Sequence, residues 1–105
     1  MILYFNYVTK TIEYLKKHFF VPEKSSQEAI KIGSWKLAVR FLGEDDYTKY
    51  SESQINVAMQ KFKRNANEDS YYELTDLIVD YLIEHKNIKE NHSEEVRTEL
   101  VKFIE

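Results

Sequence analysis

Cysteine is absent from this chain of 105 residues. Its absence excludes disulfides and thiolate zinc sites and fits a reducing compartment. Only two glycines and one proline are present, so turns that need positive φ are scarce and a β fold with many hairpins is disfavoured. No apolar run approaches the roughly 18 residues of a membrane span, and no cation precedes Lys10, unlike the basic start of a secretory signal. We therefore expect a cytoplasmic protein with no membrane partner.

The composition and the spacing of apolar residues predict a helical domain. Hydrophobic residues make up 43% of the chain and aromatic residues 14%, which excludes a disordered chain. The length fits one domain over residues 1–105. Helical periodicity and capping signals predict helices at about 3–20, 25–43, 51–64, 68–86 and 93–104. The predicted fold class is all-α, a compact bundle of four or five mostly antiparallel helices.

The first two predicted helices carry mixed local signals. One apolar stripe at helical spacing consists of Tyr4, Phe5, Val8, Ile12, Leu15 and Phe19. The β-forming residues at 2–8 leave a short strand as the alternative. Ser25 and Glu28 have the spacing of a capping box, and Gly43 sits where a left-handed residue would end the second helix. Gly33, unfavourable inside a helix, predicts a kink or the close approach of another helix.

The last three predicted helices begin at recognisable capping residues. Ser51 with Gln54 forms a second capping-box pattern. Asn65-Ala66-Asn67 is the expected break, and the candidate cap of the fourth helix is either Asn67 or Ser70 with Glu73. Ser93 is the expected cap of the fifth helix.

The charges are distributed unevenly along the chain. Residues 1–64 carry a balance of +4 and residues 65–105 a balance of −7. Five acids of the fourth predicted helix recur at spacings of four, three, four and four, and they are Asp69, Glu73, Asp76, Asp80 and Glu84. This spacing places them on one side of the helix, where they repel one another by a few tenths of a kcal/mol per pair. A basic partner would offset that repulsion.

The acidic stripe and nearby tyrosines are the candidate partner-binding surface. Charge of one sign steers an oppositely charged partner, and tyrosine is a frequent interface anchor. The candidate residues are Asp69, Tyr72, Glu73, Asp76, Asp80, Glu84, Tyr47 and Tyr50. In the alternative interpretation the acids form only the solvated side of an amphipathic helix, and Tyr72 packs inside with Val79 and Ile83.

The residues needed for catalysis are missing from the sequence. There is no cysteine nucleophile and no Gly-x-Ser-x-Gly turn, and His18, His85 and His92 fall at helix ends or in a loop. No histidine joins the carboxylates at metal-ligand spacing, although Mg²⁺ or Ca²⁺ on the acidic stripe stays an alternative. We therefore predict a protein that is not an enzyme, with no cofactor, no catalytic residues and no resident metal.

Two other partners remain open. Lys36, Arg40, Lys61, Lys63 and Arg64 form the basic set for a small nucleic-acid-associated regulator. The segment between the second and third helices is longer than the three or four residues of a helix-turn-helix, which weighs against that regulator. The oppositely charged halves of the chain would also allow a homodimer.

In general character the chain resembles the small helical immunity proteins of bacterial toxin systems, including those of contact-dependent inhibition. The likeness lies in its size, its lack of catalytic residues and its surface of Glu73, Asp76, Asp80, Glu84 and Tyr72. The resemblance implies a bacterial protein that neutralises a basic nuclease toxin by covering its active site. Phage-encoded inhibitors of host proteins have the same general character and are the alternative.

Overall fold

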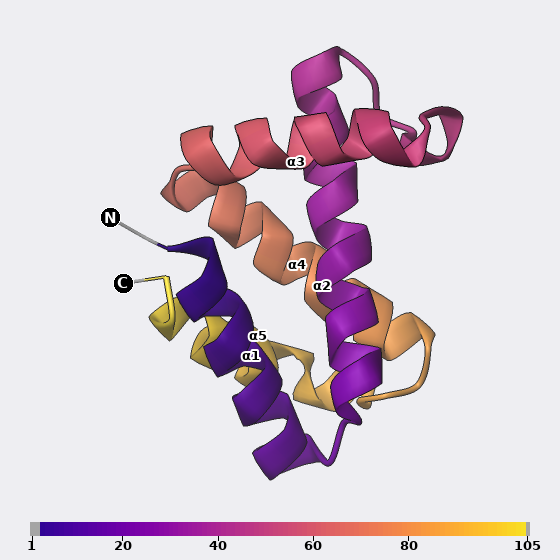
Figure 1. Ribbon diagram of the computed structural model, residues 1–105. Coiled ribbons are helices and arrows are strands. Elements are labelled where there is room, and N and C mark those ends of the chain that lie inside the picture. Colours follow the sequence, from indigo (N-terminus) through magenta and orange to yellow (C-terminus); the bar gives the residue numbers. More distant parts are fainter. Residues whose placement is uncertain (1–2, 105) are drawn as a thin grey trace.

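The computed structural model describes residues 3–104 and is helical over most of that range. Within it, five α-helices follow one another, joined by short 3₁₀ segments (Figure 1). They are α1 Tyr4–Phe19, α2 Glu23–Ala38, α3 Glu52–Asn65, α4 Glu68–Glu84 and α5 Ser93–Lys102, with η1 Val39–Leu42, η2 Tyr47–Lys49 and η3 Glu90–His92. Residues 3–104 contain no strand, so the all-α prediction is confirmed.

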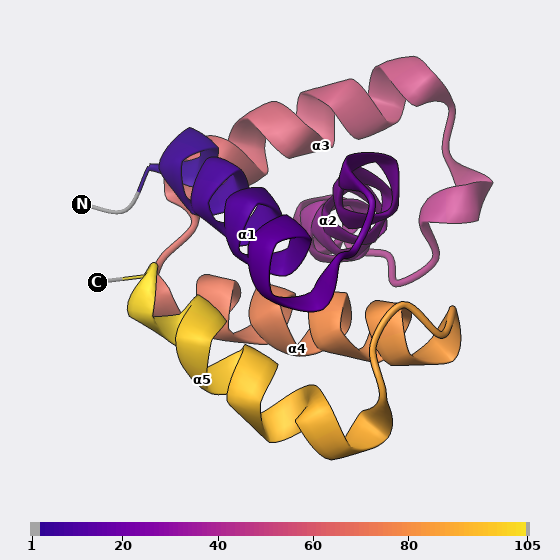
Figure 2. The same cartoon turned by 90° about the horizontal axis from the view of Figure 1, so that it is seen from below.

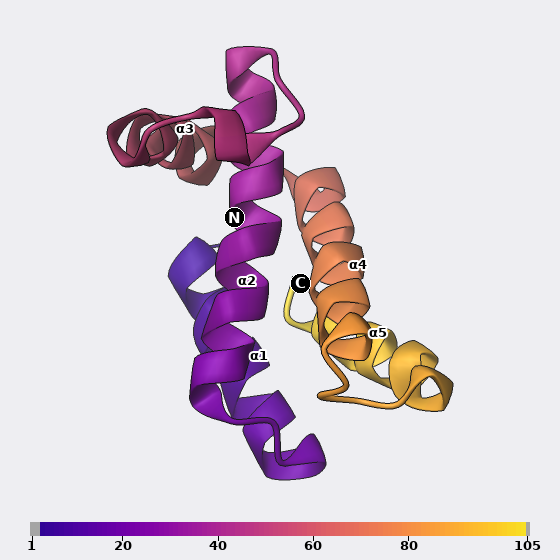
Figure 3. The same ribbon diagram turned by 90° about the vertical axis from the view of Figure 1, so that its right-hand side faces the viewer.

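Helices α2 and α4 form the centre of the bundle and share its most extensive interface. Helix α3 crosses α2 steeply near the end of α2 (Figure 1), and α5 runs along the outer side of α4 (Figure 3). Helix α1 lies beside α2 and completes the enclosure of the core, as the view from below shows (Figure 2). All five helices of the described range contribute buried side chains to one hydrophobic core.

The close approach of α2 and α4 depends on Gly33. An added Cβ at this position would lie 3.0 Å from Leu74 Cδ1 and 3.4 Å from Leu77 Cβ, both in α4. Glycine therefore lets the two helices pack more closely than a larger residue would allow. The predicted close approach of another helix is confirmed.

Buried hydroxyl groups set the orientation of α1. Tyr7 is fully buried and its hydroxyl lies 2.6 Å from Thr75 Oγ1 in α4, whereas Phe5 is 75% exposed. The expected stripe through Phe5 was therefore wrong at that position, because hydrogen bonding allows a tyrosine to be buried in its place. The alternative strand at 2–8 is also wrong over residues 4–8, and residue 2 lies outside the described residues.

Two predicted helix starts differ from the structure. Helix α2 begins at Glu23 directly after Pro22, and no side chain caps it, so the Ser25–Glu28 capping box is wrong. Pro22, whose fixed φ suits a helix start, takes the N-cap position three residues earlier than the serine pattern suggested. Helix α5 begins with Ser93 inside the helix, after the 3₁₀ turn η3, and not with Ser93 as its cap.

The remaining start and stop signals are confirmed. Ser51 and Gln54 form the complete capping box of α3, and Asn67 accepts a hydrogen bond from the backbone N–H of Ser70 at the start of α4. Gly43 adopts the left-handed conformation with φ of 78° after η1. These signals act within a few residues, so the sequence alone was enough to read them.

Candidate functional site

The five acids predicted to form a stripe all belong to α4, and all five side chains are exposed. We call Asp69, Glu73, Asp76, Asp80 and Glu84 the acidic face. Asn67 caps the helix, and Glu68 with Asp69 in its first turn suits the positive end of the helix dipole. The opposite side of α4 is fixed in the core by buried residues such as Leu74, Ile78 and Leu82. The core thus orients the acidic face toward solvent.

Two carboxylates of the acidic face are paired with arginines of the same chain. Arg40 of η1 donates a hydrogen bond to Glu73, and Arg97 Nε of α5 lies 2.5 Å from Asp76 Oδ1. The Asp76 hydrogen bond and charge raise the pKa of Arg97. All four side chains are about half exposed, and such surface pairs contribute only about 0–1 kcal/mol each. Within residues 3–104, Asp69, Asp80 and Glu84 make no ion pair.

Acids of η3 and α5 extend the acidic face. A shallow hollow of about 250 Å³ lies between α4 and α5. Its lining residues are Asp76, Val79, Asp80, Ile83, Glu90, Ser93, Glu94 and Arg97. Neither Glu90 nor Glu94 was among the residues that the sequence singled out for this surface. The packing of α5 along α4 brings them beside Asp80, a relation that no local spacing encodes.

The tyrosines predicted as anchors are only partly exposed. Tyr72 is partly buried and packs against the edge of the core. It is therefore neither fully exposed nor fully buried, the two outcomes that the sequence left open. Tyr47 packs against Trp35 of α2 at 5.6 Å between ring centres. Tyr50 follows η2 and is also partly buried. Contacts within the monomer therefore hold Tyr47 and Tyr72 in place before any partner binds.

The predicted basic set is partly occupied by contacts within the chain. Arg40 is paired with Glu73, and Lys63 Nζ lies 5.1 Å from the centre of the Tyr4 ring, a cation–π contact. Lys36, Lys61 and Arg64 are exposed. A phosphate backbone would therefore compete with existing partners at two of these five positions.

The histidines lie apart from the acidic face or at its end. His85 Nδ1 lies 2.9 Å from the carbonyl oxygen of Tyr81, and its ring stacks on the Tyr81 ring at 3.8 Å between centres. His92 Nδ1 lies 3.7 Å from Glu95 Oε2. Among the described residues, no group of three or more histidines and carboxylates is arranged to hold a metal ion.

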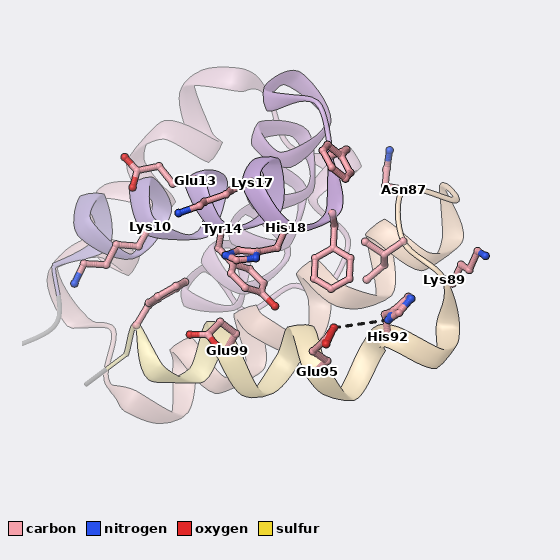
Figure 4. A pocket seen from close by; sticks show the side chains of 14 residues that line it. Lys10, Glu13, Tyr14, Lys17, His18, Asn87, Lys89, His92, Glu95 and Glu99 are labelled. Carbon is pink, nitrogen blue, oxygen red and sulfur yellow. Dashed lines mark ion pairs between the residues drawn. The ribbon is translucent and has the colours of Figure 1, made fainter.

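A second surface feature lies between α1 and α5. It is a groove of about 920 Å³ whose floor is aromatic and whose rim is charged (Figure 4). We call it the aromatic groove, and it is lined by Lys10, Glu13, Tyr14, Lys17, His18, Phe19, Phe20, Asn87, Ile88, Lys89, His92, Glu95, Glu99 and Phe103. Burial, with a smaller contribution from the nearby charges of Glu95 and Glu99, raises the pKa of Tyr14. The sequence reasoning missed this groove because its walls come from opposite ends of the chain.

Comparisons with known proteins find no matching protein family, curated protein or solved structure. In the described part of the chain, no helix has both the length and the apolar character needed to span a bilayer.

Proposed function

We propose that the protein is a cytoplasmic immunity protein that binds a basic, nuclease-type toxin domain and covers its active site. The observation that carries the proposal is the acidic face, where Asp69, Asp80 and Glu84 are exposed and have no ion pair within the described residues. Glu90 and Glu94 add acidic groups beside Asp80. A nuclease active site binds phosphates with cations, and a row of carboxylates can take the place of those phosphates.

The electrostatics of the acidic face favour rapid capture of a basic partner. Charges of one sign on a surface raise association rates by about 10- to 1,000-fold at low salt. The pairs Arg40–Glu73 and Arg97–Asp76 oppose this effect in the free protein. Because both pairs are half exposed and individually weak, a cationic site can replace the arginines at small cost.

The partly buried tyrosines would serve as preorganised anchors. Tyr72 and Tyr47 are already held by packing, so less side-chain entropy is lost when a partner covers them. An aromatic ring with a polar hydroxyl also suits a surface that contacts water in the free protein and is covered by the partner in the complex.

The test requires a candidate toxin, and the first to try is any basic nuclease domain encoded next to the gene for this chain. Cleavage of a nucleic-acid substrate is measured with increasing inhibitor, together with association rates at several salt concentrations. The variant Asp80→Asn/Glu84→Gln removes two charges from the acidic face. We expect its association rate to fall about three- to tenfold at low salt, with a smaller difference at high salt.

The matched control is Glu23→Gln/Glu52→Gln, which changes the net charge by the same amount outside the acidic face. Both control residues are exposed and lie in the first turns of α2 and α3. We expect the control to inhibit like the wild type. Equal effects of the two variants, or no inhibition by the wild-type chain, would contradict the proposal.

The nucleic-acid alternative predicts a different result in a simpler assay. A regulator that uses Lys36, Lys61 and Arg64 would bind generic duplex DNA with an affinity that falls steeply as salt rises. An inhibitor that presents carboxylates would not bind the duplex. If the neighbouring genes belong to a phage and encode no toxin, the same acidic face would point to a host protein as the target.

A further inference from the structure

Phe20 has an unusual conformation and environment. It follows α1 with φ of 55° and ψ of 29°, in the left-handed region, and 86% of its side chain is exposed. Left-handed geometry costs a residue with a Cβ about 1–2 kcal/mol, and glycine is the usual residue at this point of a helix end. An exposed phenyl ring gains little from the monomer in return. Phe20 also lies at the aromatic groove.

The walls of the aromatic groove carry charges of opposite sign. Helix α1 contributes Lys10 and Lys17, although Glu13 also lies on this wall, and α5 contributes Glu95 and Glu99 (Figure 4). Within residues 3–104, no ion pair connects the two walls across the groove. Glu95 has a contact with His92 and Glu99 with Lys102, both within the α5 side of the groove and both partly exposed. Exposed pairs of this kind are weak, so the lysines of a second molecule can replace these partners at small cost.

The rings between these walls form an apolar floor. Tyr14 packs edge-on against Phe19 at 5.8 Å and against Phe103 at 6.2 Å between ring centres, and Phe19 packs against His92 at 5.4 Å. Aromatic side chains in a hollow are suitable partners for another aromatic ring. The same chain thus presents both a projecting ring and a hollow lined with rings.

We propose that the aromatic groove is the interface of a homodimer, in which Phe20 of each copy enters the groove of the other. A two-fold axis parallel to the groove places α1 of one copy over α5 of the other, so Lys10 and Lys17 face Glu95 and Glu99. An axis in the interface but perpendicular to the groove would place α1 over α1 and oppose like charges. Charge complementarity therefore selects both the occupant and the orientation.

The dimer should be weak. Helix α1 spans 16 residues and α5 only 10, so their shared face is at the lower end of the size of specific interfaces. We expect a dissociation constant of about 1–100 μM, in which the phenyl ring contributes most of the affinity.

The first experiment is sedimentation of the full chain over a concentration series. Phe20→Asn removes the ring and tolerates the left-handed backbone, so the monomer should fold as well as the wild type. Phe5→Asn removes a ring that is 75% exposed outside the groove and is the matched control. One hot-spot residue is worth a factor of about 30, and the substitution removes one ring from each copy, so we expect Phe20→Asn to weaken dimerisation by about 1,000-fold. We expect the control to dimerise like the wild type.

The second experiment exchanges the charges of the walls. Lys10→Glu/Lys17→Glu makes both walls acidic, and Glu95→Lys/Glu99→Lys makes both walls basic. We expect each variant to be monomeric alone, and an equimolar mixture to form heterodimers because each acidic wall then faces a basic one. Circular dichroism of each variant confirms that it is folded.

A wild-type chain that stays monomeric at about 1 mM would overturn the proposal, because its dissociation constant would then lie well above the expected range of about 1–100 μM. A dimer that persists in Phe20→Asn, or a mixture that fails to associate, would place the interface elsewhere. These outcomes are independent of toxin inhibition. Asp80→Asn/Glu84→Gln should leave the dimer unchanged, so failure of either proposal can be recognised separately.

Discussion

The buried pair Tyr7–Thr75 offers a quantitative test of how α1 is held on α4. Both residues are fully buried, and Tyr7 Oη lies 2.6 Å from Thr75 Oγ1. Thr75 Oγ1 also donates a hydrogen bond to the carbonyl oxygen of Tyr71 at 2.9 Å. Its single hydrogen is therefore engaged, so Tyr7 must be the donor in the bond between the two hydroxyls.

This geometry predicts unequal effects of the two single substitutions. Thr75→Val leaves the Tyr7 hydroxyl buried without a partner and should destabilise the fold by about 1–3 kcal/mol. Tyr7→Phe removes the donor and leaves only an acceptor unpaired, which should cost about 0.5–1.5 kcal/mol. The double variant removes both hydroxyls of the pair, so neither is left without the other. Its free energy of unfolding should therefore exceed the value expected from adding the two single effects by about 1–2 kcal/mol.

The measurement is urea unfolding followed by far-ultraviolet circular dichroism and by the fluorescence of Trp35, the one tryptophan of the chain. Thr98→Val is the matched control, because Thr98 is exposed in α5 and its loss should change stability by no more than about 0.5 kcal/mol. Additive effects within about 0.3–0.5 kcal/mol, or a cost of Thr75→Val equal to that of the control, would refute the reasoning. Such a result would mean that water or another group satisfies Tyr7.

Three further predictions concern pH, backbone strain and packing. Burial raises the pKa of Tyr7 above its ordinary value, so the unfolded chain loses this proton at a lower pH than the folded one. The free energy of unfolding should therefore fall as the pH rises above about 10. Between about pH 9 and 11, the urea midpoint of Tyr7→Phe should fall less than that of the wild type. Lys86 has a left-handed backbone with φ of 59°, which glycine adopts without strain. Lys86→Gly should therefore stabilise the fold by about 0.5–1 kcal/mol and raise its melting temperature by a few degrees. An unchanged melting temperature would argue against strain at this residue. Gly33→Ala places a Cβ 3.0 Å from Leu74 Cδ1. The cost of overpacking, about 1–3 kcal/mol, should outweigh the gain in helix propensity, about 1 kcal/mol, so the variant should be less stable. A variant that is more stable in urea unfolding would show that the core relaxes around the added methyl group.

Features of the fold that depend on nearby residues were predictable. The capping box at Ser51, the cap at Asn67 and the left-handed Gly43 each act over a few residues, and all three are confirmed. Ser25 shows the limit of such signals, because Pro22 starts α2 earlier and leaves the serine inside the helix. The expected stripe through Phe5 failed for a different reason. Hydrophobic spacing alone does not reveal that a buried hydroxyl has a partner 68 residues away.

The candidate surfaces were predictable to different degrees. Helical spacing gave the five members of the acidic face, and the structure places all of them in solvent. Spacing gave no indication that Arg97 would pair with Asp76, 21 residues earlier, or that Glu94 would lie beside Asp80. Whether toxin binding uses this face stays a prediction.

By itself, the sequence determined the all-α class, the acidic face and most of the helix ends, because helical periodicity and capping are interactions between residues a few positions apart. Only the tertiary structure decided which rings are buried, which carboxylates meet an arginine and where the aromatic groove forms. Those properties depend on the packing of α1 against α4 and α5, of η1 near α4, and of α5 along α4, and the partners lie 21 to 68 residues apart in the hydrogen bonds Arg97–Asp76, Arg40–Glu73 and Tyr7–Thr75. Contacts between such segments follow from the shape and hydrogen bonding of the whole core.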